Sequence, residues 1–194
     1  MIIAVSGVPG VGKTKAAKIL AKKLGASVIS IAALVEAGKI PYAWDKVRRT
    51  RVVSAKDVQK AVNAAMKGKS RTFVIEGHLA HLLDADAVFI LRCEPSMLRR
   101  RLRARRWRAA KIEENVQAEM LDSTTAEALE RKDRRVYEID TTHRSATQTA
   151  AIMLRILRSA AYAARFRPGR VRWLARAMQN SNSLAVLSRR RFPA

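Results

Sequence analysis

The sequence predicts an α/β fold in which a five-stranded parallel sheet is flanked by helices. Short apolar runs alternate with segments whose apolar residues recur at helical spacing, which is typical of parallel strands joined by crossover helices. A glycine-rich turn separates the first apolar run from a helical segment. With 194 residues the chain is long enough for one domain with a substantial core, but short for two.

The expected strands are short enough to cross a sheet once and apolar enough to be buried on both faces. In chain order they are "MIIAVS" (1–6), "SVISI" (27–31), "TFVIE" (72–76), "AVFIL" (87–91) and "VYEI" (136–139).

The expected helices carry start signals and one apolar face. The first follows the glycine-rich turn and buries Ala17, Leu20, Ala21 and Leu24. A second starts at Ser54, with Asp57 three residues on, ends near Gly68 and buries Val58, Val62 and Met66. A third starts near Pro95, which suits a first helical turn. The last core helix starts at Ser145, with Gln148 three residues on, and buries Ile152, Ile156 and Leu157.

The stretch "GVPGVGKT", residues 7–14, matches the P-loop pattern G-x-x-x-x-G-K-[ST], whose backbone N–H groups surround nucleotide phosphates. Gly7, Gly10 and Gly12 allow backbone angles and close approaches that a β-carbon would obstruct. Lys13 is expected between the β- and γ-phosphates, and the Thr14 hydroxyl on Mg²⁺. A glycine-rich surface turn is the alternative, but strand, loop and helix follow in the order that binding of ATP or GTP requires.

Glu76 ends the third apolar run and is the candidate for the carboxylate that phosphoryl-transfer sites need near Mg²⁺. Its carboxylate would hold the metal ion directly or through a water molecule. It could also polarise an attacking water, or be an ordinary strand-end acid. His78 is a candidate hydrogen-bond donor or water-positioning group at the γ-phosphate, and a surface or core histidine is the equal alternative. His78 and His81 could ligate a metal only if the segment between them is helical and a further ligand is near.

The arginine-rich segment "RRRLRARRWRAAK" (99–111) fits two roles. Arginines neutralise charge on a transferring phosphoryl group, and Arg101 and Arg105 are one helical turn apart, so that both can reach the same phosphates. The remaining arginines are then expected to face solvent or RNA.

The chain carries 39 Lys and Arg against 16 Asp and Glu, a formal net charge of +23. Solubility needs only about 2–8 charges, so the excess favours a polyanionic partner, with nucleic acid first, over a solubilising role. After Asp140 there is no acidic residue and eleven arginines follow. We expect residues 1–164 to form the domain and residues 165–194 a basic C-terminal extension.

The single cysteine, Cys93, excludes an intramolecular disulfide and a zinc site built from several cysteines. It ends an apolar run and is expected to be a small strand-end residue rather than a nucleophile. No secretory leader or membrane-length apolar run is recognisable, so we expect a cytoplasmic protein without a membrane partner, nuclear if the source has a nucleus.

Four motifs in order, "GVPGVGKT", "EGH", "RLRARRWRAAKIEENVQAEMLD" and "IDTT", resemble the adenylate kinase isoenzyme 6 family, also called the coilin-interacting nuclear ATPase family. The resemblance covers residues 1–160, and the arginine-rich motif is its most specific part. It implies a nucleoside monophosphate (NMP) kinase fold with an NMP-binding insertion at about 30–53 and a short lid at about 104–114.

The resemblance also implies roles for individual residues. Gly10, Gly12, Lys13, Thr14 and Lys15 would hold the ATP phosphates, and Glu76 and His78 would form the family's acid-x-His motif. Arg105 would be the lid arginine on ATP with Arg101 nearby, and Arg144 would contact the base or ribose. The implied cofactors are ATP and Mg²⁺, and the implied acceptor is AMP or another NMP.

Three functions follow as hypotheses. The first, implied by the resemblance, is an ATPase with broad adenylate kinase activity that acts in maturation of the small ribosomal subunit, through a ribosomal protein and rRNA. The second is a purely metabolic NMP kinase. The third is an RNA-binding assembly factor for which nucleotide is only a conformational ligand.

Overall fold

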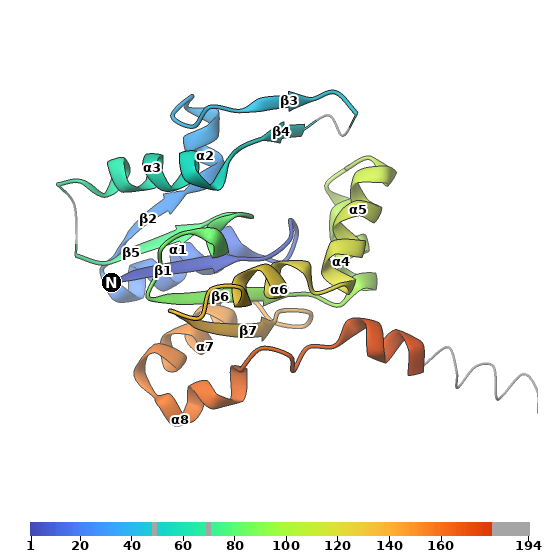
Figure 1. Cartoon of the computed structure of the whole chain (residues 1–194). Coiled ribbons are helices and arrows are strands. Elements are labelled where there is room, and N and C mark those ends of the chain that lie inside the picture. Colours follow the sequence, from blue (N-terminus) through green and yellow to red (C-terminus); the bar gives the residue numbers. More distant parts are fainter. Residues whose placement is uncertain (48–49, 69–70, 180–194) are drawn as a thin grey trace, which may run out of the picture.

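The computed structural model describes residues 1–47, 50–68 and 71–179, and within them it shows a five-stranded parallel sheet (Figure 1). The strands are β1 (Ile2–Ser6), β2 (Ser27–Ser30), β5 (Phe73–Glu76), β6 (Ala87–Arg92) and β7 (Arg135–Asp140). Their spatial order is β2-β5-β1-β6-β7, and every neighbouring pair is parallel. All five predicted strands are confirmed. Because the sheet is parallel, residues that follow β1, β5 and β7 meet at one edge.

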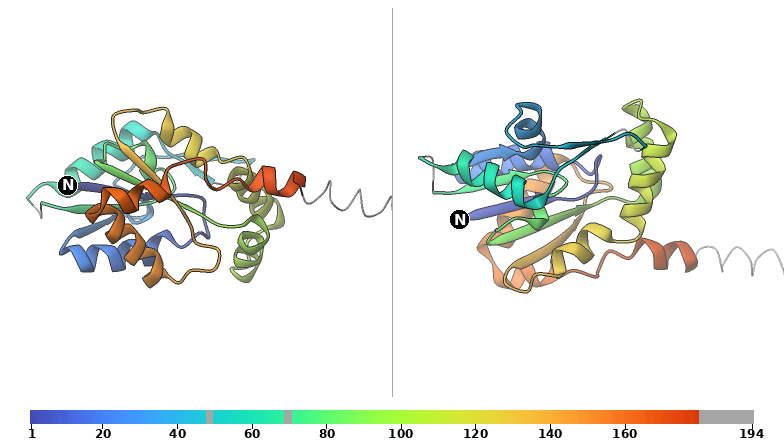
Figure 2. Two further views of the ribbon diagram at one scale, coloured as in Figure 1. Left: turned by 90° about the horizontal axis from the view of Figure 1, so that it is seen from below. Right: turned by 45° about the horizontal axis from the view of Figure 1, so that its top comes forward.

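Helices cover both faces of the sheet (Figures 1 and 2). Their bounds are α1 (Lys13–Leu24), α2 (Ile31–Glu36), α3 (Ala55–Met66), α4 (Pro95–Ala104), α5 (Ala109–Met120), α6 (Ser123–Leu129), α7 (Ala146–Arg158) and α8 (Ala160–Ala163), with short 3₁₀ helices η1 (Ala80–Leu82) and η2 (Ala164–Phe166). Helices α1, α4, α5 and α7 share one hydrophobic cluster, whereas α3 and α6 share the other. The alternation of strand side chains divides the core in this way: Ile3 and Val5 enter the first cluster and Ala4 the second.

The predicted helix starts are confirmed at Ser145, Ser54 and Pro95. Ser145 and Gln148 form a capping box, in which the Gln148 N–H donates to Ser145 Oγ at 3.1 Å and the Ser145 N–H donates to Gln148 Oε1 at 2.9 Å. Ser54 Oγ accepts from the Asp57 N–H at 3.1 Å, while the Asp57 carboxylate accepts from the Ser54 hydroxyl instead of reaching the backbone.

Some predicted core residues lie at the margin of the core. Leu24, Met66, Ile152 and Leu157 are only half-buried. Leu24 and Met66 are the last residues of α1 and α3. In α7 the buried residues are Thr149, Ala150, Met153 and Ile156. Helical spacing identified the right face of α7, but the centre of that face is displaced from Ile152 to Met153.

A two-stranded antiparallel hairpin, which the sequence did not lead us to expect, lies away from the main sheet (Figure 1). It consists of β3 (Ala43–Asp45) and β4 (Thr50–Val52), with Trp44 opposite Arg51. Its strands are three residues long and largely exposed, so they leave no alternating apolar pattern to read.

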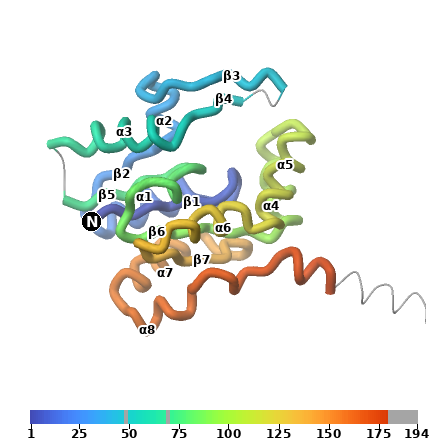
Figure 3. Tube along the Cα trace, in the orientation of Figure 1, coloured from blue at the N-terminus to red at the C-terminus, as the bar shows by residue number. Residues whose placement is uncertain are grey.

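The C-terminal segment follows η2 as a chain running along the edge of the domain (Figure 3). Val171 and Trp173 are buried, and residues 173–179 are helical. The remainder of the expected extension, residues 180–194, lies outside the described residues. Among the described helices, none has both the length and the apolar character needed to span a bilayer.

Candidate nucleotide-binding site

The glycine-rich loop joins β1 to α1 and is shaped by positions where a side chain does not fit. Gly7 has φ +132°, and a Cβ there would lie 2.4 Å from the carbonyl oxygen of Leu91. Gly10 has φ +96°, and its Cβ would lie 2.8 Å from Leu98 Cδ1. Gly12, at φ +100°, precedes the first residue of α1. The loop therefore passes close to β6 and α4 and ends at a helix N-terminus, where backbone N–H groups and the helix dipole favour phosphate.

Lys13 begins α1, and its side chain turns back along the loop. Its Nζ donates to the carbonyl oxygens of Gly7, at 2.8 Å, and Val8, at 3.0 Å. Burial lowers the pKa of Lys13 to about 8, and the nearby Glu76 carboxylate only partly opposes that effect. Because the buried ammonium group has few water contacts, a phosphate anion that approaches it stabilises the charged form strongly.

Thr14 and Glu76 meet at the carboxyl edge of the sheet. The Thr14 hydroxyl donates to Glu76 Oε2 at 3.0 Å, and Glu76 is 4% exposed. Glu76 ends β5 in register with Val5 of β1, which places its carboxylate beside the loop that follows β1. A hydroxyl and a carboxylate oxygen are hard ligands of the kind that Mg²⁺ prefers.

His78 lies beside the same loop, with Nδ1 3.5 Å from the Gly7 carbonyl oxygen. Although its side chain is exposed, desolvation by the surrounding protein and then the Lys13 ammonium lower the pKa of its imidazole. The neutral imidazole is therefore the dominant form near pH 7, able to donate one hydrogen bond and accept another.

Three arginines surround the loop from different elements. Arg101 of α4 donates to the carbonyl oxygens of Thr141, at 3.0 Å, and Thr142, at 2.8 Å, and its other nitrogen lies 3.5 Å from the Gly10 oxygen. Arg105 caps the end of α4 and is exposed. Arg144, in the loop after β7, donates to the Asp140 carbonyl oxygen.

The loop and the three arginines line a pocket of about 380 Å³, whereas His78 and Glu76 are not among its lining residues. The lining comprises residues 9–15 of the loop and helix α1 together with Arg101, Arg105, Thr141, Arg144, Ala146 and Thr149. The structure thus brings Lys13, Thr14, Lys15 and the three arginines to one cavity, with Glu76 bonded to Thr14 at its border. Its size and cationic lining suit a polyphosphate nucleotide.

His81 is not a partner of His78 in a metal site. It is 1% exposed, with Nδ1 2.9 Å from Ser6 Oγ and Nε2 2.7 Å from Glu127 Oε2, so both ring nitrogens have hydrogen-bond partners. Over residues 1–47, 50–68 and 71–179 no group of three or more His, Cys, Asp or Glu side chains is placed to hold a metal ion.

Thr141 is a site residue that the sequence did not reveal. It follows β7, and its hydroxyl lies 2.9 Å from the Val11 oxygen and 2.8 Å from the Arg92 oxygen. It therefore ties the glycine-rich loop to the ends of β6 and β7. The motif "IDTT" marks the position, but only the tertiary structure shows which hydroxyl contacts the loop.

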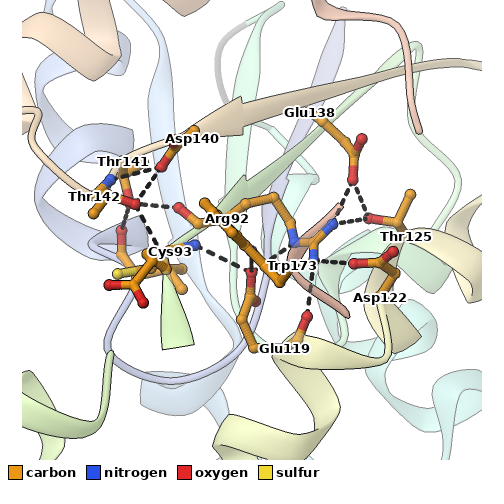
Figure 4. A network of polar contacts seen from close by, with 12 residues as sticks. Arg92, Cys93, Glu119, Asp122, Thr125, Glu138, Asp140, Thr141, Thr142 and Trp173 are labelled. Atoms are coloured by element: carbon orange, nitrogen blue, oxygen red, sulfur yellow. Dashed lines mark hydrogen bonds and ion pairs between the residues drawn. The ribbon is translucent and has the colours of Figure 1, made fainter. Parts of the chain in front are cut away.

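Behind the pocket, Arg92 is the centre of a buried ion network that the sequence also did not reveal (Figure 4). Its side chain is 2% exposed and donates to Glu119 at 2.7 Å and Glu138 at 2.5 Å, and it also pairs with Asp122. Burial raises the pKa of the Glu119 carboxyl, an effect that the Arg92 guanidinium opposes. Burial likewise raises the pKa of the neighbouring Cys93 thiol to about 12. Cys93 is buried directly after the last residue of β6, the strand-end position that the sequence predicted.

The C-terminal segment completes this network. Trp173 Nε1 donates to Glu119 Oε1 at 2.9 Å, and the Gly169 N–H donates to Glu138 Oε2 at 2.7 Å. Two buried carboxylates thereby receive hydrogen bonds from residues that lie beyond the last core helix.

Comparison with known proteins places this chain among its relatives. A family model described as "AAA domain" matches residues 3–122. A protein of Methanocaldococcus jannaschii named "Putative adenylate kinase" is 38% identical over 144 residues, which cover 74% of this chain and 78% of the relative. A protein of the same name from Archaeoglobus fulgidus is 35% identical over 177 residues, or 90% and 92% of the two chains. The chain belongs to an adenylate kinase-like family of P-loop proteins.

Solved structures agree with this adenylate kinase-like fold. The YorR protein of Bacillus subtilis, solved in complex with phosphorylated GDP, has a TM-score of 0.54 and 14% identity, with 81% of this chain and 96% of YorR covered. Shikimate kinase from Bacteroides thetaiotaomicron has a TM-score of 0.53 and 14% identity, with coverage of 82% and 99%. At this identity the likeness concerns the fold, which is that of P-loop kinases.

Proposed function

We propose that the protein is an ATP-dependent NMP kinase of the adenylate kinase isoenzyme 6 type, which transfers the γ-phosphoryl group to AMP and also hydrolyses ATP. The observation that carries the proposal is the Thr14–Glu76 contact of 3.0 Å at the border of a pocket lined by Lys13 and three arginines. The naming of the archaeal relatives supports an adenylate kinase activity.

The loop fits the phosphates of ATP. Gly7, Gly10 and Gly12 give it the shape in which backbone N–H groups surround an anion, and Lys13, Thr14 and Lys15 line the pocket beside them. Arg105 would clamp the phosphates from the end of α4, and Arg144 would contact the base or ribose from the β7–α7 loop.

Mg²⁺ fits the oxygen donors at the border of the pocket. The Thr14 hydroxyl and the Glu76 carboxylate would hold it, directly or through water. The ion supplies charge neutralisation on the β- and γ-phosphates when bound.

Protein side chains would neutralise charge on the transferring group and orient the acceptor. Lys13, Arg101 and Arg105 would neutralise the charge that develops on the transferring group, and this electrostatic term is typically the largest in phosphoryl transfer. Neutral His78, beside the Gly7 carbonyl, would orient the acceptor hydroxyl or a water molecule together with Glu76.

The division of the chain is part of this proposal. Residues 1–164 would form the kinase domain, with the NMP-binding insertion at about 30–53, which contains the β3–β4 hairpin, and the lid at about 104–114, where α4 passes into α5. Residues 165–194 would form the basic extension, anchored by Gly169 and Trp173.

Product-resolved turnover of ATP and Mg²⁺, with and without AMP, tests the proposal. We expect two ADP for each ATP consumed when AMP is present, slower release of phosphate without AMP, and loss of both in Lys13→Ala but not in Lys18→Ala, an exposed lysine of the same helix. Negligible hydrolysis without AMP would favour a purely metabolic kinase. Nucleotide binding without turnover would contradict the proposed enzyme activity and favour an assembly factor for which nucleotide is only a conformational ligand.

A second role, in the cytoplasm or in the nucleus where one exists, is supported by the charge of +23. We propose that the protein associates with a small-subunit ribosomal protein and rRNA during subunit assembly. Exposed arginines on α4 and the following turn, including Arg103 and Arg108, would contact RNA phosphates. A steep, linear fall of log affinity for RNA with log salt is expected, and affinity that does not change with salt would contradict this role.

A further inference from the structure

The β3–β4 hairpin and the turn that joins α4 to α5 lie on the same side of the sheet (Figure 1). Residues of these two segments line a second pocket, of about 640 Å³. We call it the Trp44–Trp107 pocket. Besides the two tryptophans its lining comprises Val47, Arg106, Arg108, Ala110, Lys111 and Glu114. It shares no lining residue with the nucleotide pocket, which Arg105 lines, but its walls belong to the proposed NMP-binding insertion and lid.

The aromatic side of this pocket is exposed without a packing reason. Trp44 is 55% exposed and Val47 93% exposed, on a hairpin of two three-residue strands that pairs with no other strand of the described chain. A tryptophan normally contributes to stability by being buried in a core, and an isolated two-stranded hairpin buries little of its surface. Trp107 is half-buried against the core, so it forms a firm wall on the opposite side.

The other side of the pocket is cationic. Within the described residues, Arg106 and Arg108 form no ion pair, whereas Lys111 pairs with Glu114 at 2.9 Å. Arg106 has φ +57°, a conformation uncommon outside glycine, and its N–H donates to the Arg103 oxygen at 2.8 Å. In the part of the chain that the structure describes, the turn thus holds guanidinium groups without a carboxylate partner beside an exposed indole.

We propose that the Trp44–Trp107 pocket binds a single-stranded polynucleotide, with an unpaired base stacked on Trp44 and its phosphates on Arg106 and Arg108. The inference rests on the proposed association with RNA and assigns its site. Exposed aromatic faces beside arginines are the combination that single strands require, since any base offers a π-face and each phosphate a charge. A duplex keeps its bases stacked inside and cannot use Trp44 in this way.

The experiment is fluorescence anisotropy of a labelled 12-nucleotide single-stranded RNA with the full-length chain, without ATP or AMP. Because no nucleotide is added, the readout is independent of kinase activity. Trp44→Ala is expected to weaken binding about tenfold and Trp44→Phe much less, as for loss of one stacked base. The matched control is Leu129→Ala, an exposed apolar residue of α6.

Charge is tested separately by salt dependence. The double variant Arg106→Ala/Arg108→Ala is expected to reduce the slope of log Kd against log salt by about 0.7 for each phosphate that is no longer neutralised. Lys56→Ala/Lys60→Ala removes the same charge from exposed positions on α3 and is expected to leave the slope nearly unchanged.

The outcomes separate the site from the function. If the wild-type chain fails to bind the RNA at all, the proposed association with RNA fails and the site with it. If wild type binds but Trp44→Ala matches Leu129→Ala, RNA is held elsewhere and this site is overturned. Equal competition by a duplex of the same sequence, or by polyglutamate, would show a general anion surface and would also overturn the stacking site.

Discussion

The indole Nε1 of Trp173 donates a hydrogen bond to Oε1 of Glu119, 2.9 Å away, inside the protein. The same carboxylate oxygen accepts from Arg92 Nε and from the Cys93 N–H. Glu119 lies near the end of α5, and Cys93 directly precedes Glu94, the N-cap of α4. A residue of the C-terminal segment is therefore bonded to the carboxylate that joins the two helices around the proposed lid.

Trp173→Phe is expected to lower the free energy of unfolding by about 1.5–3 kcal/mol, the usual contribution of a hydrogen bond to a charged group. Phenylalanine keeps one aromatic ring at this buried position, so the measured loss combines the N–H hydrogen bond with a smaller loss of packing. Urea unfolding followed by circular dichroism measures it. Leu174→Ala, at a neighbouring residue that is 43% exposed, is the control, and an equal effect of both changes would mean that the indole N–H contributes nothing.

Arg92→Met is expected to destabilise the fold by about 3–5 kcal/mol, because it leaves Glu119 and Glu138 buried without their cation. The pH dependence gives a second readout. Burial already raises the pKa of Glu119, and without Arg92 it rises further, so the folded variant binds more protons than its unfolded chain above the ordinary carboxyl range. Its stability must then fall as pH rises, and the deficit relative to wild type is expected to be larger at pH 8 than at pH 5.

Arg158→Met, at an exposed position on α7, removes the same charge outside the network and serves as the control. A deficit for Arg92→Met that does not change with pH would show that the carboxylates regain water in the variant.

The sequence was sufficient for features that depend on neighbouring residues. The five strands, the glycine-rich loop and the Ser145 capping box are set by local pattern and backbone geometry. The proximity of Thr14 and Glu76, 62 residues apart, could also be expected, because parallel strands end at a common edge. Features that depend on packing between distant elements were not predictable.

Arg92 shows why. It ends an apolar run as Glu76 does, but its partners Glu119 and Glu138 are 27 and 46 residues away on α5 and β7. Which carboxylates meet it depends on how α5 packs on the sheet, and no spacing in the sequence contains that information. The same holds for His81, whose contact with Glu127 depends on α6.

Affinity for ATP is expected to fall as pH rises through about 8, where Lys13 loses its proton in the nucleotide-free protein. Phosphate favours the ammonium form and must raise this pKa, so binding above that pH requires proton uptake. The affinity for ATP is expected to fall by at most about tenfold for each pH unit above this pKa. Isothermal titration between pH 7.5 and 9.5, in two buffers of different ionisation enthalpy, measures both the affinity and the protons taken up.

Lys13→Met removes the titrating group and is expected to bind ATP weakly, with little dependence on pH over this range. If the variant shows the same pH slope as wild type, the slope arises from another group, and the depressed pKa of Lys13 has no role in nucleotide binding.

Glu76→Gln tests the carboxylate beside Thr14. The amide preserves the shape of the side chain and can still accept the Thr14 hydroxyl hydrogen bond, but it lacks the negative charge that Mg²⁺ requires. We expect kcat to fall by about 100-fold, the scale of losing one preorganised electrostatic group, and the Mg²⁺ concentration for half-maximal rate to rise. Glu130→Gln, at an exposed position after α6, controls for the loss of one negative charge. Wild-type turnover and an unchanged Mg²⁺ requirement in Glu76→Gln would instead identify Glu76 as an ordinary strand-end acid that only positions Thr14.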